Sequence, residues 1–235
     1  MPSFVREMEF RKKSNHILIE VGARPSPLSI AQVKEVRILL QLQYPDIEFS
    51  THLISTTGDQ DQITSLRILE KTDFFTREID RWVLEKKGRV GIHSAKDLPQ
   101  VMAKGLILFC LTTGIDSSDS LVLLPEAQFE TLPVGARIGT SSERRENRIR
   151  EIRDDFVFCD IRGTIEQRLA KLYAGELEGV VIAEAALLRL GLHHLNRIRL
   201  SGVTVEGQGK LAVVGHEDDT ALQHLFFSID GRKND

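Results

Sequence analysis

The chain has 235 residues, 41% hydrophobic and 28% charged, with a formal net charge of −3, which is typical of a globular protein with one large domain or two of usual size. The near balance of charge disfavours nucleic acid or an anionic membrane as a partner, and no apolar run approaches the roughly 20 residues of a membrane span. The two cysteines and seven histidines show no metal-ligand spacing, so we expect a cytoplasmic protein without a metal site. We also expect a monomer.

Strands and helices alternate in the first half of the chain. The apolar run 16–21 predicts a strand, and Ser26 followed by Pro27 predicts the N-cap and first residue of a helix. The next predicted elements are a strand at 47–55, a loop at 58–71, a helix at 73–87, a strand at 90–92 and a short apolar run at 106–111. Residues 112–120 are polar and turn-forming, and we expect the chain to cross to a second domain there.

The same alternation restarts beyond this crossover. Thr140 with Glu143, and Thr164 with Gln167, match the capping-box pattern and predict two helix starts. The other predicted elements are strands at 137–139, 156–159 and 180–182, and a helix at 183–190 that ends at Gly191. Strands alternating with helices of this length predict an α/β fold of two lobes with mostly parallel sheets.

The end of the chain is expected to return to the first lobe, because Val213 and Val214 predict a late strand. This gives domain 1 from residues 1–112 with the return segment 213–235, and domain 2 from residues 113–212. The two connecting segments would form a hinge between the lobes.

Asp97 follows the third predicted strand, in the run 93–99 with the sequence HSAKDLP. Because a residue before proline is kept extended, this short turn projects polar side chains out of the strand end. The neighbouring Lys96 would favour the ionised form of the Asp97 carboxyl group. Ligands of open α/β sheets bind at the carboxyl ends of strands, so Asp97 is a candidate site residue. The alternative is an aspartate that only caps a turn.

Arginines follow the predicted strands in the same way. Four come just after strands and a fifth lies on the next helix: Arg24, Arg144, Arg145, Arg162 and Arg168. Guanidinium groups pair with carboxylates through two parallel hydrogen bonds and stay charged, so this set favours a substrate with several carboxylates. A lone acid among them suggests a reacting centre that becomes cationic. For any single arginine, the alternative is a solvated helix face.

Other charged residues have simpler interpretations. The segment 144–155 carries five arginines and four acids, and this small positive excess is insufficient for a phosphate-binding face. His93 is interpreted as a structural hydrogen-bonding residue. Asp59 and Asp61 are interpreted as loop acids, because two carboxylates without further oxygen donors are a weak cation signal.

Several blocks of the sequence carry a family resemblance. They are RPSPL at 24–28, TGD at 57–59, HSAKDLP at 93–99, GTSS at 139–142 with Arg144 and Arg145, DIRG at 160–163, RL at 168–169, 187–192 and GQG at 207–209. In this order they resemble porphobilinogen deaminase (hydroxymethylbilane synthase), a transferase of tetrapyrrole (heme) biosynthesis. That family condenses four porphobilinogen units head to tail into hydroxymethylbilane and releases ammonia. The resemblance implies two lobes similar to type II periplasmic binding proteins.

The resemblance also implies roles for particular residues. Asp97 corresponds to the catalytic aspartate, which stabilises the pyrrole N–H as ammonia leaves and a cationic azafulvene forms. The arginines that bind acetate and propionate groups of the substrate porphobilinogen and of the dipyrromethane cofactor correspond to Arg24, Arg144, Arg145, Arg162, Arg168 and, by resemblance alone, Arg189. Residues lining the same cleft correspond to Ser26, Ser94, Lys96, Thr140, Ser142 and Gly163.

The sequence departs from the family pattern near the expected site. Lys71, in the run EKTD at 70–73, is the candidate substitute for a loop lysine of the family. Thr164 replaces an asparagine, and Glu143 puts a negative charge beside the paired arginines.

A further departure concerns the cofactor. The chain stops at Asp235, so we expect the small third α/β domain of the family to be absent, together with the cysteine that carries dipyrromethane. Cys110 lies in an apolar run and is interpreted as a core thiol. Cys159, three residues before Arg162, is the candidate replacement anchor. The alternative is a primer held by the arginines without a covalent bond.

Two functional hypotheses follow from these residues. The first is a short porphobilinogen deaminase. The second is a non-catalytic two-lobed binding protein for a small polycarboxylate or pyrrole ligand, since a fold does not decide function. Asp97 in its full motif favours the enzyme, and the missing cysteine favours the binding protein.

Overall fold

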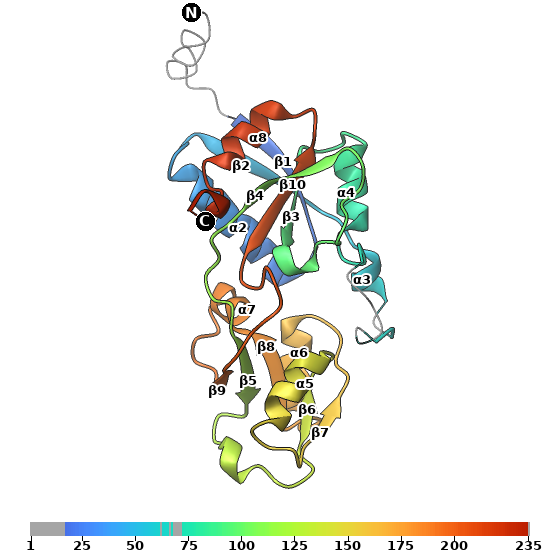
Figure 1. Cartoon of the computed structure of the whole chain (residues 1–235), viewed down its shortest axis with the longest axis vertical. Coiled ribbons are helices and arrows are strands. Elements are labelled where there is room, and N and C mark those ends of the chain that lie inside the picture. The colour runs from blue at the N-terminus through green and yellow to red at the C-terminus, as the bar shows by residue number, and fades with distance from the viewer. Residues whose placement is uncertain (1–16, 62, 66, 68–71, 235) are drawn as a thin grey trace, which may run out of the picture.

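The computed structural model describes residues 17–61, 63–65, 67 and 72–234, and these residues form two five-stranded sheets. Figure 1 shows the sheets in two lobes that follow one another along the long axis of the molecule. The chain passes between the lobes twice, once before β5 (Asp119–Leu123) and once after β9 (Arg197–Leu200). The α/β fold of two lobes predicted from the sequence is thereby confirmed.

The first sheet has the strand order β2-β1-β3-β10-β4. Its strands are β1 (Ile17–Ala23), β2 (Ile47–Leu53), β3 (Val90–Ser94), β4 (Leu106–Leu111) and β10 (Leu211–His216). β1 pairs in parallel with β2 and β3, whereas β10 is antiparallel to β3 and β4. The late strand β10 therefore lies within the first sheet. This topology supports the proposed division into domain 1 (1–112 with 213–235) and domain 2 (113–212).

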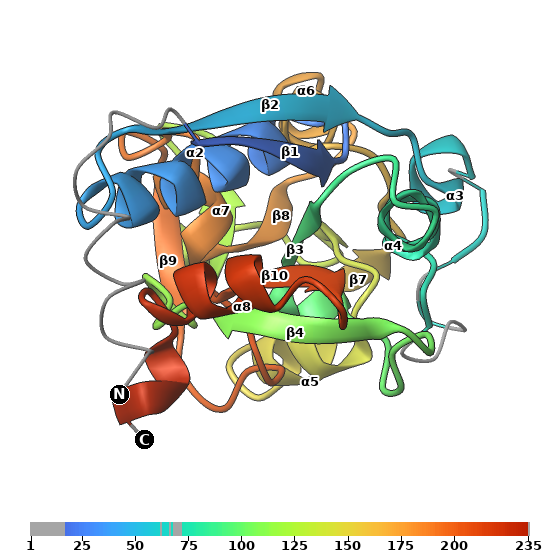
Figure 2. The same ribbon diagram turned by 90° about the horizontal axis from the view of Figure 1, so that it is seen from above.

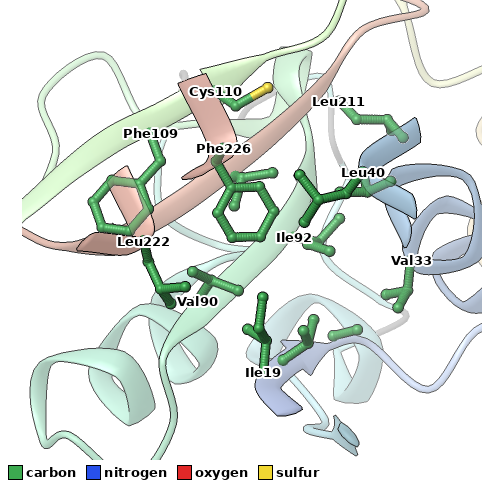
Figure 3. Close-up of a cluster of buried hydrophobic side chains, with 14 of the residues drawn as sticks. Ile19, Val33, Leu40, Val90, Ile92, Phe109, Cys110, Leu211, Leu222 and Phe226 are labelled. Carbon is green, nitrogen blue, oxygen red and sulfur yellow. The ribbon is translucent and has the colours of Figure 1, made fainter. Parts of the chain in front are cut away.

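Helices cover both faces of the first sheet. The principal core holds side chains from α2 (Pro27–Gln41) and α8 (Thr220–Phe227), whereas α4 (Arg77–Leu84) packs with a separate cluster. Figure 2 shows α4 set apart from α2 and α8. In the core, Phe226 lies between Phe109 and Leu40 (Figure 3), and its ring centroid is 6.5 Å from that of Phe109. Ser26 caps α2 as predicted, because its hydroxyl accepts a hydrogen bond from the Ser29 amide at 3.2 Å.

The second sheet has the strand order β7-β6-β8-β5-β9. Its remaining elements are β6 (Arg137–Gly139), β7 (Val157–Cys159), β8 (Gly179–Ala183), α5 (Glu143–Arg150), α6 (Ile165–Tyr173) and α7 (Glu184–Arg189). Adjacent residues of β5 face opposite sides: Leu121 packs in one buried cluster with Ile149 of α5, and Val122 packs in the other with Leu169 of α6. The alternation arises because successive side chains of a strand point to opposite faces.

The structure corrects two predictions from the sequence and adds two strands. The sheets are mixed, and the prediction of mostly parallel sheets is wrong, because β10 and β5 both enter antiparallel to their neighbours. Ser142, and not Thr140, is the N-cap of α5 and accepts from the Arg145 amide at 3.5 Å. The structure also adds β5 and β9, which are not among the strands predicted from the sequence. The capping box of Thr164 and Gln167 at the start of α6 is confirmed.

Short helices complete the described residues: α3 (Thr57–Gln60) and the 3-10 turns η1 (Ala95–Asp97), η2 (Phe129–Thr131) and η3 (Gly231–Asn234). Within the described ranges, no helix combines the length and apolar character needed to cross a bilayer. In that same part of the chain, no cluster of three or more His, Cys, Asp or Glu side chains is arranged to hold a metal ion.

Candidate active site

Two cavities receive side chains from both lobes. The first has a volume of about 260 Å³ and lies where β1 and β3 end and α6 begins. Of the predicted site residues it is lined by Arg24, Ser26, Ser94, Lys96, Asp97, Arg145, Arg162, Gly163 and Arg168. The second has a volume of about 370 Å³, and the predicted residues lining it are Lys96, Asp97, Ser142, Arg144 and Arg145. Lys96, Asp97 and Arg145 line both, so they form the boundary between the two cavities.

The backbone of β3 positions Asp97 at this boundary. β3 is paired on both sides, by β1 and β10, and the chain then makes the single turn η1 that ends at Asp97. Leu98, just before Pro99, has an extended ψ of 142°, as proline requires of the residue before it. One turn upstream, Ser94 accepts a hydrogen bond from Gln32 Nε2 at 2.8 Å, which holds the strand end against α2.

Lys96 is a partly buried cation with a weak partner. Its Nζ donates to Gln208 Oε1 at 3.5 Å, and no carboxylate among the described residues forms an ion pair with it. Removal from water, and then the charge of Arg145, lower the pKa of Lys96 to about 8, although Asp97 and Asp119 act in the opposite direction. The ammonium group is therefore poised to gain from an anionic ligand.

Arg162 and Arg168 are also partly buried cations that form no ion pair with a carboxylate in the described part of the chain. Arg162 Nη2 donates to the carbonyl oxygens of Gly58 and Asp61 at 3.1 and 2.5 Å, while its Nε and Nη1 are buried with no hydrogen-bond partner among the residues that the structure describes. Arg168 Nε donates to the Gly163 carbonyl at 3.0 Å. Burial lowers the pKa of Arg162, and burial with the neighbouring Arg145 lowers that of Arg168 to about 10. Buried donors without acceptors are unfavourable, so Arg162 favours a ligand that brings carboxylates, and a carboxylate would likewise offset the burial of the Arg168 charge.

Arg24 already has a counter-ion. Its Nε donates to Asp59 Oδ1 at 3.0 Å, and its guanidinium carbon lies 4.5 Å from the ring centroid of Phe75. Burial opposes ionisation of Asp59, but Arg24 and Thr56 outweigh it and lower the pKa of Asp59. The interpretation of Asp59 as a loop acid did not include this contact, because the partners are 35 residues apart in the sequence.

Arg144 and Arg145 share a counter-ion, Asp119, that was not predicted from the sequence. Arg144 Nη2 donates to Asp119 Oδ2 at 2.5 Å, and Arg145 Nη2 donates to Asp119 Oδ1 at 2.6 Å. Asp119 is the first residue of β5 and is 1% exposed. A signal was present in the sequence: Asp119 lies two residues before the apolar run 121–124. Glu143, beside the pair, is exposed and lines the second cavity.

Several predicted residues lie away from the cavities. Arg189 is 5% exposed and forms an ion pair with Glu35, so the geometry does not support a carboxylate-binding role. Thr140 is 1% exposed, and its hydroxyl accepts from the Ser142 amide at 3.2 Å, beneath the cleft surface. Cys159 lies on the edge strand β7 and lines neither cavity. Lys71 falls outside the described residues.

His93 and Cys110 are buried and have structural roles. His93 is buried with its Nε2 3.2 Å from Asp80 Oδ1, in agreement with a structural role. Cys110 is buried, its Sγ contacts the Ile229 carbonyl at 3.5 Å, and burial raises the pKa of its thiol to about 12. Cys110 is thus a core thiol, as predicted.

Residues 19–224 match the family model described as porphobilinogen deaminase, dipyromethane cofactor binding domain. The chain belongs to the porphobilinogen deaminase family. The matched range includes both lobes, so the resemblance inferred from short blocks is confirmed along most of the chain.

Curated relatives agree with this assignment. The porphobilinogen deaminase of Nostoc sp. is 37% identical over 218 residues, which are 90% of this chain and 68% of the relative. A protein of Chlamydia pneumoniae named "Probable porphobilinogen deaminase" is 36% identical over 211 residues, or 90% of this chain and 89% of that relative.

Solved structures support the fold alone. The probable amino-acid ABC transporter extracellular-binding protein of Bacillus subtilis is 11% identical, with a TM-score of 0.50 over 92% of this chain and 90% of that chain. The BenM effector-binding domain has a TM-score of 0.53 at 11% identity over 92% and 91% of the two chains. The predicted likeness to two-lobed type II periplasmic binding proteins is confirmed.

Proposed function

We propose that this chain condenses porphobilinogen units head to tail, four in all, into hydroxymethylbilane with release of ammonia, as a transferase of tetrapyrrole (heme) biosynthesis. One observation carries the proposal: Asp97 is at the boundary of two cavities whose cations, Lys96, Arg162 and Arg168, lack carboxylate partners among the described residues. Porphobilinogen brings two carboxylates for such cations and a pyrrole nitrogen for the lone acid. Family membership supports the same chemistry.

Asp97 is proposed to act on the reacting centre. As ammonia leaves the substrate, positive charge develops over the pyrrole ring, and a fixed carboxylate at the ring N–H stabilises that charge. The paired strand β3 fixes the backbone before it, so little reorganisation is needed. The same carboxylate then accepts or returns a proton when the two rings join.

The arginines are proposed to orient both reaction partners. Arg24, Arg162 and Arg168 line the first cavity, Arg144 lines the second, and Arg145 lines both. Two cavities that share Asp97 suit two pyrrole rings whose reacting carbons meet at that carboxylate. Holding both in place makes the joining step effectively unimolecular, which is a large contribution to rate.

The residues present fit a dipyrromethane cofactor. Within the described ranges, the buried Nε and Nη1 of Arg162 have no hydrogen-bond partner, and the acid side chains of dipyrromethane would satisfy them, with Arg145 and Arg168 beside them. When bound, dipyrromethane supplies the pyrrole carbon to which the first substrate unit is joined. The position of Cys159 outside both cavities favours retention by the arginines over attachment at Cys159.

The alternative, a binding protein without turnover, shares the fold but assigns no chemical role to Asp97. Incubation with porphobilinogen, followed by uroporphyrin absorbance, separates the two hypotheses. We expect product from the wild-type chain and none above background from Asp97→Asn. Binding of porphobilinogen without any product in the wild type would establish the alternative.

We also propose that the chain works as a monomer in the cytoplasm, with porphobilinogen as its small-molecule partner and without nucleic acid or membrane. The formal net charge of −3 supports the absence of a polyanion partner. Light scattering during size-exclusion chromatography tests the monomer, for which the expected mass is 26.5 kDa.

A further inference from the structure

Two consecutive arginines converge on one carboxylate. Arg144 and Arg145 lie on the first turn of α5, so their side chains leave the helix about 100° apart. Both nevertheless contact Asp119: Arg144 Nη2 reaches Oδ2 at 2.5 Å, and Arg145 Nε and Nη2 reach Oδ1 at 3.0 and 2.6 Å. A single acid therefore fixes the direction of both guanidinium groups.

Asp119 is itself held rigidly. Its backbone is paired on both sides within the second sheet, with Ala183 of β8 and Leu200 of β9. Its Oδ1 also accepts from Gln208 Nε2 at 3.0 Å, and the same Nε2 donates to the Ser117 carbonyl at 2.7 Å. Gln208 comes from the segment returning to the first lobe and Ser117 from the segment leaving it, so the carboxylate lies where both connections meet.

The charge of Asp119 also reduces the net positive charge of Arg144 and Arg145. Burial opposes its ionisation, but Arg145 and Arg144 outweigh burial and lower the pKa of Asp119, so the group is ionised at neutral pH. The trio of Asp119, Arg144 and Arg145 then carries one net positive charge. Asp119 lines neither cavity, whereas Arg145 lines both and Arg144 lines the second.

We propose that Asp119 is a positioning residue for substrate binding: it acts through Arg144 and Arg145 and orients their remaining N–H groups toward a carboxylate in the cavities. This inference rests on the proposed function for the identity of the ligand. A guanidinium group held on one edge keeps its other edge in a fixed direction, which reduces the entropy lost when a ligand carboxylate binds.

Asp119→Asn is the direct test, and Asp116→Asn is its matched control. Asp116 is in the same connecting segment and pairs with Arg199, but it contacts neither arginine of the pair. We expect Asp119→Asn to weaken porphobilinogen binding at least tenfold by calorimetry, and Asp116→Asn to change it less than twofold. Equal affinity of Asp119→Asn and wild type would overturn the inference.

The combination with Arg145→Ala separates positioning from a general loss of stability. Because Asp119 acts partly through Arg145, the loss of affinity in the double variant should be smaller than the product of the two single losses. Multiplication of the two single effects would show that Asp119 acts independently of Arg145, and would overturn the inference. If Asp119→Asn does not fold, Asp119→Glu replaces it, since it keeps the charge and displaces the carboxylate by one methylene. Weakened binding then supports the inference, and wild-type affinity overturns it.

A ligand-free measurement keeps this inference distinct from the proposed function. In nitrogen-15 NMR spectra, the Nε–H of Arg145, assigned by its loss in Arg145→Ala, should exchange slowly with water. It should exchange fast in Asp119→Asn and slowly in Asp116→Asn, and slow exchange in Asp119→Asn would overturn the positioning role. Absence of porphobilinogen binding by wild type, with the NMR result as expected, would refute the proposed function and support the positioning of the arginines.

Discussion

Arg189 and Glu35 form a two-point ion pair between the lobes. Arg189 Nε donates to Glu35 Oε2 at 2.7 Å and its Nη2 donates to Oε1 at 2.9 Å, joining α7 of one lobe to α2 of the other. The same Nη2 donates to the Gly209 carbonyl at 2.9 Å, in the returning connection. The side chains are 5% and 22% exposed, so this contact is shielded from solvent. The geometry favours an inter-lobe contact over ligand binding for Arg189.

Arg189→Ala should therefore reduce stability and leave ligand affinity largely intact. Removing one partner of a mostly buried pair leaves the other charge uncompensated, and we expect a loss of about 3 kcal/mol in the free energy of unfolding. Denaturant unfolding and calorimetry with porphobilinogen measure the two effects. Arg148→Ala, which breaks only the exposed pair with Glu151, should cost less than about 1 kcal/mol. A tenfold loss of affinity in folded Arg189→Ala would restore the carboxylate-binding role that the family resemblance implied.

Asp97→Asn should separate chemistry from binding. The amide has the same shape but lacks the negative charge that stabilises a cationic substrate, so we expect kcat to fall by about 10² or more. Porphobilinogen affinity should change little, because the carboxylates of the ligand contact cations elsewhere in the cavities. Pre-steady-state product formation and calorimetry provide the readings. Turnover within tenfold of wild type would remove Asp97 from the reaction.

Arg168→Met should stabilise the protein while weakening ligand binding. The guanidinium group is partly buried with no carboxylate partner in the described part of the chain, and burial lowers its pKa to about 10. A methionine of similar length avoids this desolvation, so the unfolding midpoint should rise by a few degrees, corresponding to about 1 kcal/mol. Porphobilinogen binding should weaken about tenfold or more. Arg153→Met, which breaks a pair with Asp155 outside the cavities, should alter stability only in the unfavourable direction. A lower midpoint for Arg168→Met would contradict the argument.

Stability should depend on pH through Lys96. Its pKa falls from 10.5 in the unfolded chain to about 8 in the fold, so between these values the unfolded state binds more protons. The free energy of unfolding contributed by this group therefore rises as pH increases from about 8 to 10.5 and is constant outside that window. Wild type minus Lys96→Met, measured by denaturant unfolding at pH 7.5 and 10.5, isolates the effect from other titrating groups. A difference that is flat or falls with pH would disprove it.

Cys159→Ala should leave any bound dipyrromethane in place. Cys159 lies on β7 and lines neither cavity, so a thioether there would hold the cofactor away from the arginines. Intact-mass measurement under denaturing conditions is the test. Wild type with an added dipyrromethane mass that disappears in Cys159→Ala would establish Cys159 as the anchor.

The sequence correctly predicted features that depend on interactions between neighbouring residues. The N-cap at Ser26, the capping box of Thr164 and Gln167, and the extended residue before Pro99 depend on neighbours within a few positions, and all three occur in the structure. The start of α5 was predicted two residues early, because Thr140 and Ser142 both offer a hydroxyl and only the backbone geometry selects one. The antiparallel entry of β5 and β10 depends on where distant strands leave space at a sheet, which periodicity does not encode.

The sequence by itself determined the two α/β lobes, and it indicated Asp97 and most of the arginines that line the cavities. Strand ends and turn residues reveal which side chains reach the carboxyl edge of a sheet. Only the tertiary structure decided the partners of those side chains: Asp119 for Arg144 and Arg145, Asp59 for Arg24, and Glu35 for Arg189. Ion pairs between groups 25 to 154 residues apart depend on how the lobes pack, and a pattern read along the chain carries no such distances.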